Sequence, residues 1–418
     1  MNATTPRPRI ALYSHDTVGL GHTRRQLALA HELARHHAGA DLLLVTGNPE
    51  ATLLPAPDRT DVVTLPTVTK AADGSYVPRR LGSDLESVVG LRSAILTAAL
   101  TSFSPDLLIV DKVPQGLCGE LLQSLEALRG RTRMVLGLRE VLDDTATTRA
   151  EWLTGRTEDV IRDYYDEVWV YGDPSVFDPA KEYGWGTDTV AKTVQLGYLG
   201  RLTPAGSARQ TPAGSARPHE LPNRYVLCQM GGGADGLALA EAFLSASLPD
   251  GYEGVVLTGA YLPAHDRLRL ESLAAAGGHR RVIGFTDQAE DWLLSASAVV
   301  SMGGYNSTVE ILSGKVPALV VPRIHPRTEQ LIRAQSLAAT GALDVLVPNE
   351  LTPERIGDWL AAVLNTPGPQ PQPTPTPQTG HGSIPDRMLR ARSALDLNGL
   401  QTLAHRTDNL IGVSHHAA

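Results

Sequence analysis

Cysteine, lysine and long apolar runs are all scarce in this 418-residue sequence. The two cysteines, Cys118 and Cys228, stand far apart. Their spacing predicts neither a disulfide framework nor a metal-binding pair, and a reducing cytoplasm is the expected compartment. No stretch approaches the roughly 20 consecutive apolar residues of a transmembrane helix. The opening MNATTPRPRI has no apolar core, so we expect no secretory signal.

Basic residues are also fewer than acidic residues. Lys and Arg number 37 against 45 Asp and Glu, which makes the net charge −8. Nucleic-acid binding needs a basic surface, so no nucleic-acid partner is expected. With 42% hydrophobic and 20% charged residues, the composition is that of a globular protein. The length suggests about two to three domains.

The first half of the chain alternates short apolar runs with helical patterns such as residues 22–37 and 116–129. This alternation predicts an α/β domain with a parallel sheet and crossover helices. The predicted strands are residues 9–14, 41–46, 61–65, 106–110, 133–138 and 167–171.

The second half repeats this alternation after a change in composition. The sequence TPAGSAR occurs twice, at 203–209 and 211–217, and such small residues predict a linker. Six prolines at alternate positions from 367 to 377 predict an extended spacer. An amphipathic pattern over 385–411 predicts a last helix. The predicted strands are residues 224–229, 254–258, 280–284, 298–301, 316–321 and 343–347.

The expected organisation therefore has two α/β domains and two connecting segments. The predicted parts are an N-terminal acceptor-side domain (1–202), a linker (203–222), a C-terminal ligand-binding domain (223–366), a proline-rich spacer (367–383) and a C-terminal helix (384–418). In parallel α/β sheets, ligands bind at the carboxyl ends of the strands, so the loops there are the place to look for function.

The first strand runs directly into the glycine-rich loop YSHDTVGLGHTRR (13–25). Its glycines allow a ligand to approach the backbone, and the following helix presents N–H groups to an anion. A dinucleotide fingerprint would need a glycine where Arg24 stands, and no Walker A motif occurs in the sequence. His15, Asp16 and His22 in one short loop favour a functional site over a plain helix cap.

Two further loops of the second half have similar character. The segment QMGGGADG (229–236) is either a phosphate-binding loop or a sharp strand-to-helix turn. In SMGGYNSTVEILSGKVPALVVP (301–322), Asn-Ser-Thr stands at a helix start, where a diphosphate could be clamped. Glu310 could accept two hydrogen bonds from a ribose diol. Glu329 and Gln330 begin another helix and suit sugar hydroxyls.

This last segment resembles the donor-binding half of GT-B glycosyltransferases of family 28. The shared pattern is Gly-Gly-x-Asn-Ser/Thr-x-x-Glu, then Gly-x-Pro-apolar-Pro, then Glu/Asp-Gln. The opening SHDTVGLGHTRR is similar to a predicted-glycosyltransferase subgroup that has SHD-x-x-GLGH-x-RR. The resemblance covers residues 9–347. It implies the α/β GT-B fold, with two Rossmann-like doubly wound domains facing a cleft and a returning C-terminal helix.

The resemblance implies specific roles on the donor side. Glu310 would hold the ribose, the glycine-rich loop with the 306–308 segment would hold the diphosphate, and residues 285–287 would contact the base. Glu329 and Gln330 would read the sugar. The implied donor-binding residues are Gly21, Gly231, Gly232, Gly233, Phe285, Thr286, Gly303, Gly304, Asn306, Ser307, Thr308, Glu310, Glu329 and Gln330.

The expected reaction is direct displacement at the anomeric carbon. A general base removes the acceptor proton while the loops stabilise the leaving diphosphate. The resemblance implies inversion, no metal and no cofactor, and the chain has no Asp-x-Asp metal motif in a suitable context. His22 is the first candidate for the base and His15 the second. Asp16 or Asp111 could orient or replace it.

The acceptor is the least defined part of the prediction. Arg24, Arg79 and Arg139 are the candidate acceptor-side residues. The polar segment KAADGSYVPRR (70–80) lines an acceptor pocket or is a solvated loop, and Arg139 faces the cleft or forms a surface ion pair. A small molecule, a glycan and a lipid-linked acceptor all remain candidates. Peripheral contact with the inner face of a membrane and the oligomeric state stay open.

The leading prediction is transfer of a sugar from a nucleotide-diphosphate donor, such as a UDP-sugar. A nucleotide-sugar epimerase or hydrolase of the same fold is one alternative. It would need acid/base carboxylates at the sugar or an activated water, and no acceptor pocket. A non-catalytic nucleotide-sugar-binding partner subunit is another. The polar residues of the 13–25 loop argue against that last alternative, because binding alone would not need them.

Overall fold

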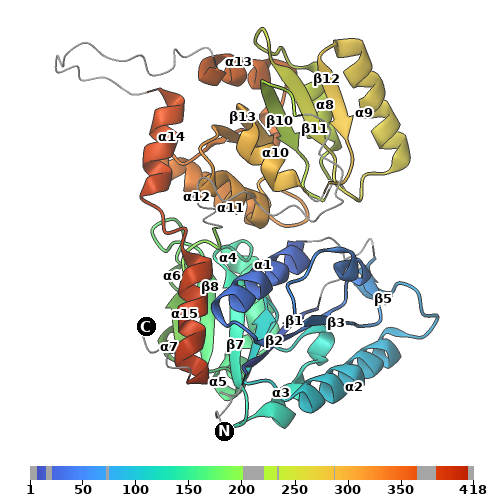
Figure 1. Ribbon diagram of the computed structural model, residues 1–418, viewed down its shortest axis with the longest axis vertical. Helices are drawn as coiled ribbons and strands as arrows, with labels where there is room; N and C mark the ends of the chain where they lie inside the picture. The colour runs from blue at the N-terminus through green and yellow to red at the C-terminus, as the bar shows by residue number, and fades with distance from the viewer. Residues whose placement is uncertain are drawn as a thin grey trace, which may run out of the picture. The chain divides into compact units, whose positions relative to one another are not determined.

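The computed structural model describes residues 7–15, 21–71, 75–200, 221–232, 235–286, 288–364 and 383–412. Contacts divide the chain into unit 1, Met1–Leu199 with Asn398–Ala418, and unit 2, Gly200–Leu397. Each unit contains a parallel sheet with helices (Figure 1). The duplicated TPAGSAR linker and the proline-rich spacer lie outside the described residues. Within those residues, no helix is both long and apolar enough to span a membrane.

Unit 1 is built on a seven-stranded parallel sheet in the order β3-β2-β1-β6-β7-β8-β9. Its central strands are mostly apolar and buried along nearly their whole length, because helices cover both faces of the sheet. The strands are β1 Arg9–Ser14, β2 Asp41–Thr46, β3 Thr60–Thr64, β6 Leu107–Asp111, β7 Arg133–Arg139, β8 Glu167–Tyr171 and β9 Thr193–Gln195.

The helices of unit 1 pack on the sheet through buried apolar side chains. Leu96 and Leu100 of α2, Leu125 of α3 and Ile161 of α5 share one core cluster with alternate strand residues. Helices α1 and α15 pack against each other; α1 also contacts β1, and α15 also contacts β6. The helices of unit 1 are α1 Gly21–His36, α2 Leu85–Phe103, α3 Leu122–Leu128, α4 Thr145–Thr154, α5 Thr157–Tyr164, α6 Pro179–Tyr183, α7 Thr187–Lys192 and α15 Gly399–Ile411, with short 3-10 turns η1 Pro49–Leu53 and η2 Leu117–Gly119.

Three strands of unit 1 were not predicted. β4 (Val68–Lys70) and β5 (Tyr76–Pro78) pair antiparallel as a separate hairpin, with β4 ending where the polar 70–80 segment begins and β5 within that segment. The third is β9, at the edge of the main sheet. Each is three residues long. A segment this short has too few residues to show a hydrophobic period.

Unit 2 repeats the same design with a six-stranded parallel sheet in the order β12-β11-β10-β13-β14-β15. The strands are β10 Tyr225–Gln229, β11 Glu253–Leu257, β12 Arg280–Ile283, β13 Ala298–Ser301, β14 Ala318–Val320 and β15 Asp344–Val345. They match the six predicted strands of this half, with ends that differ by at most two residues. The predicted α/β fold class is confirmed.

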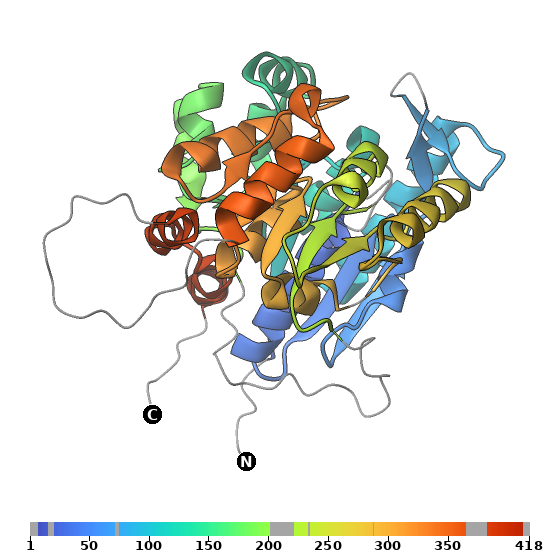
Figure 2. The same cartoon turned by 90° about the horizontal axis from the view of Figure 1, so that it is seen from above.

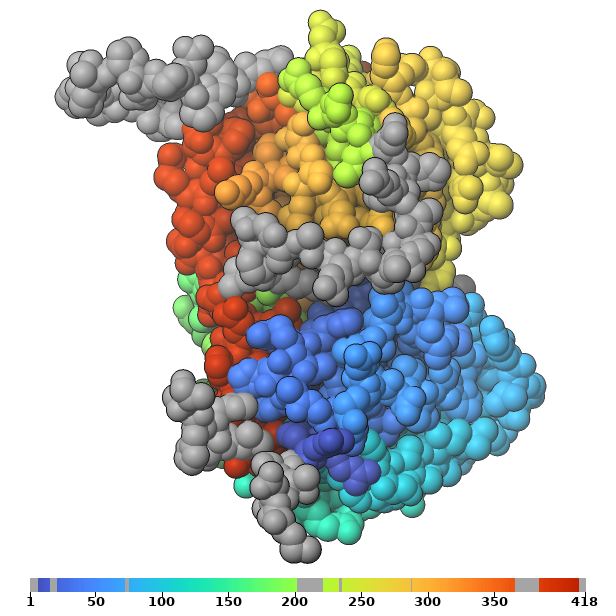
Figure 3. All heavy atoms as spheres, viewed as in Figure 1, coloured from blue at the N-terminus to red at the C-terminus, as the bar shows by residue number. Residues whose placement is uncertain are grey.

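Helices lie on both faces of the unit 2 sheet (Figure 2). Phe243 of α8, Leu270 of α9 and Leu360 of α13 share one core cluster with strand residues such as Val256. Helix α9 lies at the surface on the face shown in Figure 3. The helices of unit 2 are α8 Leu237–Ser245, α9 Ala264–Gly277, α10 Ala289–Ser295, α11 Tyr305–Ser313, α12 Glu329–Thr340, α13 Pro353–Leu364 and α14 Ile384–Ser393, with the 3-10 turn η3 Pro348–Glu350.

The single C-terminal helix predicted over 385–411 is wrong. The structure has two helices there, α14 and α15, and the segment between them contains Asn398 next to Gly399, both weak helix formers. Arg392 of α14 donates to the carbonyls of Ala342, Gly314 and Val316, so α14 belongs to unit 2. Helix α15 belongs to unit 1.

Candidate functional site

The sheet of unit 1 changes winding direction between β1 and β6. After β1 the chain passes through α1 to β2 on one side, whereas after β6 it passes through α3 to β7 on the other. The loops at the carboxyl ends of β1 and β6 therefore diverge, and such a switch point is where open α/β sheets bind ligands. His22 and Arg25 stand in the first turns of α1, and Asp111 ends β6, so all three are at this point.

Asp111 is the centre of a buried polar cluster. The Nε of Arg25 donates to its Oδ1 at 3.0 Å, and the Nη2 donates to Oδ1 at 2.8 Å and to Oδ2 at 2.6 Å. The Oδ2 also pairs with Nδ1 of His22. The side chains of Asp111 and Arg25 are 3% and 4% exposed, whereas His22 is 23% exposed. The cluster therefore presents the imidazole, and not the carboxylate, to solvent.

The charge on Asp111 determines which ring nitrogen of a neutral His22 carries the proton. Burial alone would raise the pKa of this carboxyl, but Arg25 and His22 outweigh it and hold the pKa well below its usual range. Asp111 is therefore a carboxylate, which can only accept hydrogen bonds. In the neutral form of His22, the nitrogen that faces this carboxylate, Nδ1, carries the proton, and Nε2 is the acceptor nitrogen. This arrangement is suited to a general base.

His15, the second candidate base, lies 5.5 Å from the His22 ring between ring centroids. It is 8% exposed, and its Nδ1 has no hydrogen-bond partner within the described structure. Burial is the main cause that holds the pKa of His15 well below its usual value, and the neighbouring His22 and Lys112 side chains lower it further. His15 is thus a neutral, enclosed imidazole. As a base it remains a prediction.

A second buried network lies at the carboxyl end of β1. Arg92 pairs with both oxygens of Glu120, at 2.7 Å for Oε1, and donates to the carbonyl of His15 at 3.1 Å. The hydroxyl of Tyr13 donates to Oε1 of Glu120 at 2.5 Å. Arg92 and Glu120 are fully buried. This ion pair fixes the backbone at the carboxyl end of β1, and the sequence reasoning did not find it because its members are far apart in the chain.

The other predicted residues of unit 1 are placed differently. Asp16 lies outside the described residues. Gly21 begins α1, Arg24 is half-buried in its first turn, and Arg139 ends β7 at the same edge of the sheet as Asp111. Arg79 is exposed just after the β4–β5 hairpin and is not on the main sheet. The acceptor-side roles of Arg24, Arg79 and Arg139 and the donor-binding role of Gly21 remain predictions.

Unit 2 has its own switch point between β10 and β13. The loop after β10 contains Gly231, whose φ of +66° favours glycine, and Gly232, whose carbonyl accepts from the backbone N–H of Tyr261 at 3.0 Å. The loop after β13 contains Gly303, whose φ is +70° and where an added Cβ would clash with Cγ1 of Val320 at 2.5 Å. Gly233, the third glycine, lies outside the described residues.

Helix α11 begins at the loop after β13. Its N-cap is Gly304, which supplies no side-chain oxygen to the first turn, and a Cβ added there would meet nothing within 4 Å. The backbone N–H of Thr308 donates to the Gly304 carbonyl at 2.8 Å. Ser307 and Thr308 are buried, while Asn306 and Glu310 are half-buried. A helix start with open space and a positive dipole end is suited to an anion.

Arg323 connects three parts of this edge of unit 2. Its Nη1 donates to Asp235 at 2.9 Å, its Nη2 to Glu329 at 3.0 Å, and its backbone N–H to Oε1 of Gln330 at 3.0 Å. It therefore links the end of the glycine-rich loop with the start of α12. The sequence reasoning missed Arg323, although it directly follows Pro322 in the loop that was expected to present Glu329 and Gln330.

The expected base-contacting segment follows β12. Phe285 is 54% exposed, unusual for so large an apolar side chain, and Thr286 accepts from the backbone N–H of Gln288 at 3.1 Å. Asp287 lies outside the described residues. Phe285 and Thr286 come from the carboxyl edge of the same sheet as Gly231 and Gly304. The predicted donor-side residues of unit 2 that are described thus follow the carboxyl ends of four of its strands.

Comparison with solved structures gives the fold. The chain is similar to the calicheamicin glycosyltransferase CalG4, with 18% identity, a TM-score of 0.57 and coverage of 98% of this chain and 99% of that one. It is also similar to a putative UDP-N-acetylglucosamine 2-epimerase from Listeria monocytogenes, with 12% identity, a TM-score of 0.58 and coverage of 97% and 96%. The class is therefore that of GT-B proteins, with two Rossmann-like units, as predicted.

Sequence comparison gives a family similarity for the second half of the chain. Residues 237–379 match the model of the glycosyltransferase family 28 C-terminal domain. The UDP-N-acetylglucosamine--N-acetylmuramyl-(pentapeptide) pyrophosphoryl-undecaprenol N-acetylglucosamine transferase of Rhizobium leguminosarum bv. trifolii is 40% identical over 84 residues. This match covers 20% of the chain and only 22% of that relative's length. The chain thus has the GT-B fold, and its second half is similar to the family 28 C-terminal domain, as the resemblance of the 301–330 region predicted.

Proposed function

We propose that this protein is a glycosyltransferase that moves a sugar from a nucleotide-diphosphate donor, a UDP-sugar, to an acceptor hydroxyl. The observation that carries the proposal is the His22–Asp111–Arg25 cluster at the switch point of unit 1. A plain helix start has no need of a buried carboxylate that holds a partly exposed imidazole in one tautomer. The family 28 domain of unit 2 supplies the donor side of the proposal.

In the proposed mechanism, Nε2 of His22 removes the proton from the acceptor hydroxyl as the oxygen attacks the anomeric carbon. The imidazolium that forms is stabilised by the Asp111 carboxylate, which Arg25 keeps ionised. The carbon–oxygen bond to the diphosphate breaks on the opposite side, so the anomeric configuration inverts. Base catalysis of this kind contributes about 10²–10⁴-fold to a rate.

On the donor side, we propose that Glu310 accepts hydrogen bonds from the ribose hydroxyls and that the N-terminus of α11 binds the diphosphate. The open space at Gly304 supports the second assignment. Helix N–H groups would stabilise the leaving diphosphate without a metal. Glu329 and Gln330 would read the sugar. Arg323 holds both at the start of α12 and is 27% exposed, so we add it to the donor site.

The acceptor is assigned only by class. The curated relative is named for an acceptor linked to pyrophosphoryl-undecaprenol. We propose a glycan, a small molecule or a lipid-linked acceptor for this protein, met at the cytoplasmic side of a membrane in the last case. Unit 1, which lies outside the residues matched by the family model, would provide the acceptor site through Arg24 and Arg139.

The test is incubation of the protein with UDP-, dTDP- and GDP-sugars, each with and without candidate acceptors. We expect acceptor-dependent nucleotide release with one donor class, lowered about 10²–10⁴-fold by His22→Gln. The matched control is His265→Gln, because His265 is 82% exposed on α9. Acceptor-dependent turnover that is equal in both variants would refute the role of His22.

A nucleotide-sugar epimerase is the second candidate, because the Listeria neighbour of the same fold is named as a putative one. The same incubations distinguish the two. An epimerase changes the sugar of the donor without any acceptor, whereas the transferase releases nucleotide only when an acceptor is present. Nuclear magnetic resonance of the donor after incubation without acceptor reads this directly.

A further inference from the structure

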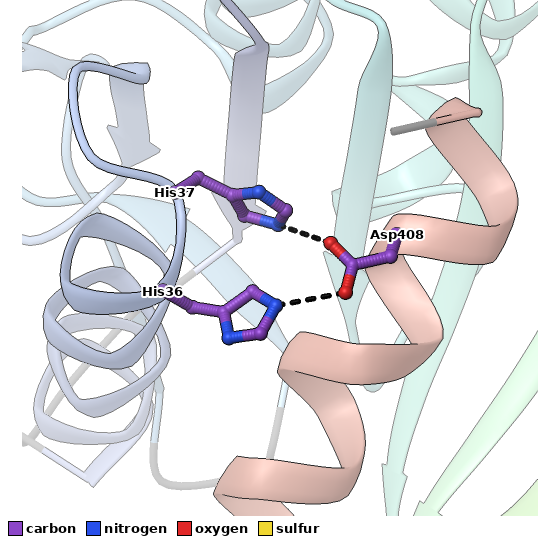
Figure 4. Close-up of side chains that lie close together, drawn as sticks. All are labelled: His36, His37 and Asp408. Atoms are coloured by element: carbon purple, nitrogen blue, oxygen red, sulfur yellow. Dashed lines mark hydrogen bonds and ion pairs between the residues drawn. The ribbon is translucent and has the colours of Figure 1, made fainter. Parts of the chain in front are cut away.

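A cluster of two histidines and an aspartate lies in unit 1 away from the His22–Asp111 site (Figure 4). Nε2 of His36 is 2.8 Å from Oδ2 of Asp408, and Nε2 of His37 is 3.6 Å from Oδ1. The three ligand atoms all lie within 4.8 Å of one another. The side chain of His37 is 1% exposed, and those of His36 and Asp408 are each 14% exposed. The cluster is therefore largely shielded from solvent.

Two separate elements hold this cluster. His36 is the last residue of α1 and His37 directly follows it, while Asp408 lies near the end of α15. Figure 4 shows both imidazoles pointing from the end of α1 toward the carboxylate on α15. His36 and Asp408 are 372 residues apart in the sequence.

Contacts that do not involve the cluster hold α15 in place. Leu403 is fully buried, and the backbone N–H of Gly399 donates to the carbonyl of Tyr198 at 2.9 Å. Arg406 forms a forked pair with Glu167, with Nε 3.0 Å from both carboxylate oxygens. The position of Asp408 is thus set independently of the histidines. Such preorganisation is what a metal site requires.

The distances suit a small divalent cation. Zinc binds imidazole nitrogen and carboxylate oxygen at about 2.0–2.2 Å, which places neighbouring ligand atoms in a tetrahedral site about 3.3 Å apart. The observed 2.8 and 3.6 Å lie on either side of this value. The cluster also stands at the C-terminal end of α1, where the helix dipole favours a cation. Two imidazoles and one carboxylate together are a zinc-type ligand set.

We propose that His36, His37 and Asp408 bind one Zn²⁺, which pins α15 to the end of α1. His405 is within reach of the fourth coordination position of the proposed zinc ion. Its ring centroid is 5.0 Å from that of His36, and its Nδ1 is 3.9 Å from Oδ2 of Asp408. The site is structural. Helix α1 has His22 and Arg25 at its other end, so the ion stabilises the helix that holds the proposed base, without touching the reacting atoms.

The test uses the full-length chain, freed of metal by dialysis against a chelator. Titration with ZnCl₂ in a calorimeter should show one saturable site per chain. Replacing zinc with Co²⁺ should give the visible absorption bands of tetrahedral cobalt–imidazole coordination. At a hundredfold excess of free zinc over its Kd, the unfolding midpoint of unit 1 should rise by about 5–10 °C.

Variants locate the site. Asp408→Asn keeps the shape of the side chain, and His37→Gln removes the most buried ligand; each should weaken zinc binding by more than about 100-fold. The matched control is the double variant His415→Ala/His416→Ala, which removes another adjacent histidine pair and should bind zinc like the wild type. Circular dichroism checks that each variant is folded.

Three results would overturn the proposal. The first is a wild-type protein without a saturable zinc site, and the second is an Asp408→Asn variant that binds zinc as the wild type does. The third is loss of binding in the His415/His416 control. In each case the cluster would be a histidine–carboxylate contact that holds α15 without a metal. None of these readouts depends on glycosyl transfer, so the proposed function is tested separately.

Discussion

The substitution Asp111→Asn tests the central cluster of unit 1 most directly. Asparagine has the shape of aspartate but no charge, and its amide nitrogen cannot accept a hydrogen bond. Arg25, 4% exposed, would then be a buried cation without a carboxylate. Removing one partner of a buried ion pair costs about 3–5 kcal/mol. We therefore expect the free energy of unfolding to fall by this amount.

The same substitution should lower turnover, because His22 would no longer be held with its proton on Nδ1. The expected loss is about 10²–10⁴-fold, equal to about 3–5 kcal/mol in the activation barrier. His22→Gln should cost a similar factor, and the double variant little more than either single variant, because the two residues act as one unit.

Three measurements check this prediction. Urea unfolding gives the stability, a transfer assay gives kcat, and nitrogen-15 resonances of the imidazole report which nitrogen of His22 carries the proton. Asp41→Asn is the matched control, since Asp41 is 42% exposed in a surface pair with Arg59, and such pairs contribute about 0–1 kcal/mol. An Asp111→Asn protein with wild-type kcat and an unchanged His22 tautomer would refute the reasoning.

The pH dependence of stability follows from the same charge. The pKa of Asp111 is lower in the folded state than its unfolded value of about 3.9, so the unfolded chain takes up the proton first. The stabilisation is complete above the unfolded value and is lost as the pH falls toward the lower folded value. Wild-type protein should therefore lose more stability than Asp111→Asn does between about pH 5 and the acid limit.

Three further predictions concern other positions. Gly304→Ala should leave stability nearly unchanged but weaken nucleotide binding, which calorimetry with UDP measures. Gly303→Ala should destabilise unit 2 by about 1–2 kcal/mol because of its positive φ, which urea unfolding measures. Glu310→Ala should weaken nucleotide binding about 10- to 100-fold, because charge-assisted hydrogen bonds to the ribose are lost. Glu271→Ala, at an exposed position, is the control. Unchanged nucleotide affinity in Glu310→Ala would reject the ribose assignment. The pKa of His15 is lowered in the folded state, so wild-type stability should fall as the pH drops below about 6.5, and His15→Gln should show a smaller fall in the same urea titration.

The strands were the easiest part of the fold to predict from the sequence. Strands of a parallel sheet are covered on both faces, so residues 107–111 and 225–229 are mostly apolar, with a polar residue only at the last position, and the two runs stand out from their surroundings. The β4–β5 hairpin was not found, because its three-residue strands lie in a polar segment. Local pattern therefore identified the long buried strands and missed the short exposed ones.

The C-terminal region shows where a periodic pattern misleads. The apolar spacing between Met388 and Leu410 predicts one amphipathic helix, and the residues do form helices with buried apolar faces. The pattern does not specify what each face packs against. The break before Gly399 and the separate packing of α14 in unit 2 and α15 in unit 1 come from those partners.

The loop sequences alone determined the candidate chemistry. The residues of GLGHTRR suggested a base in the first half, and the family 28 resemblance of the 301–322 segment implied a nucleotide-sugar site in the second. Only the tertiary structure decided the partners. Asp111 is 89 residues from His22 and Asp408 is 372 residues from His36. Strand order, which sets β6 beside β1, and helix packing, which sets α15 beside α1, depend on burial across the whole unit, and no local stretch of sequence records them.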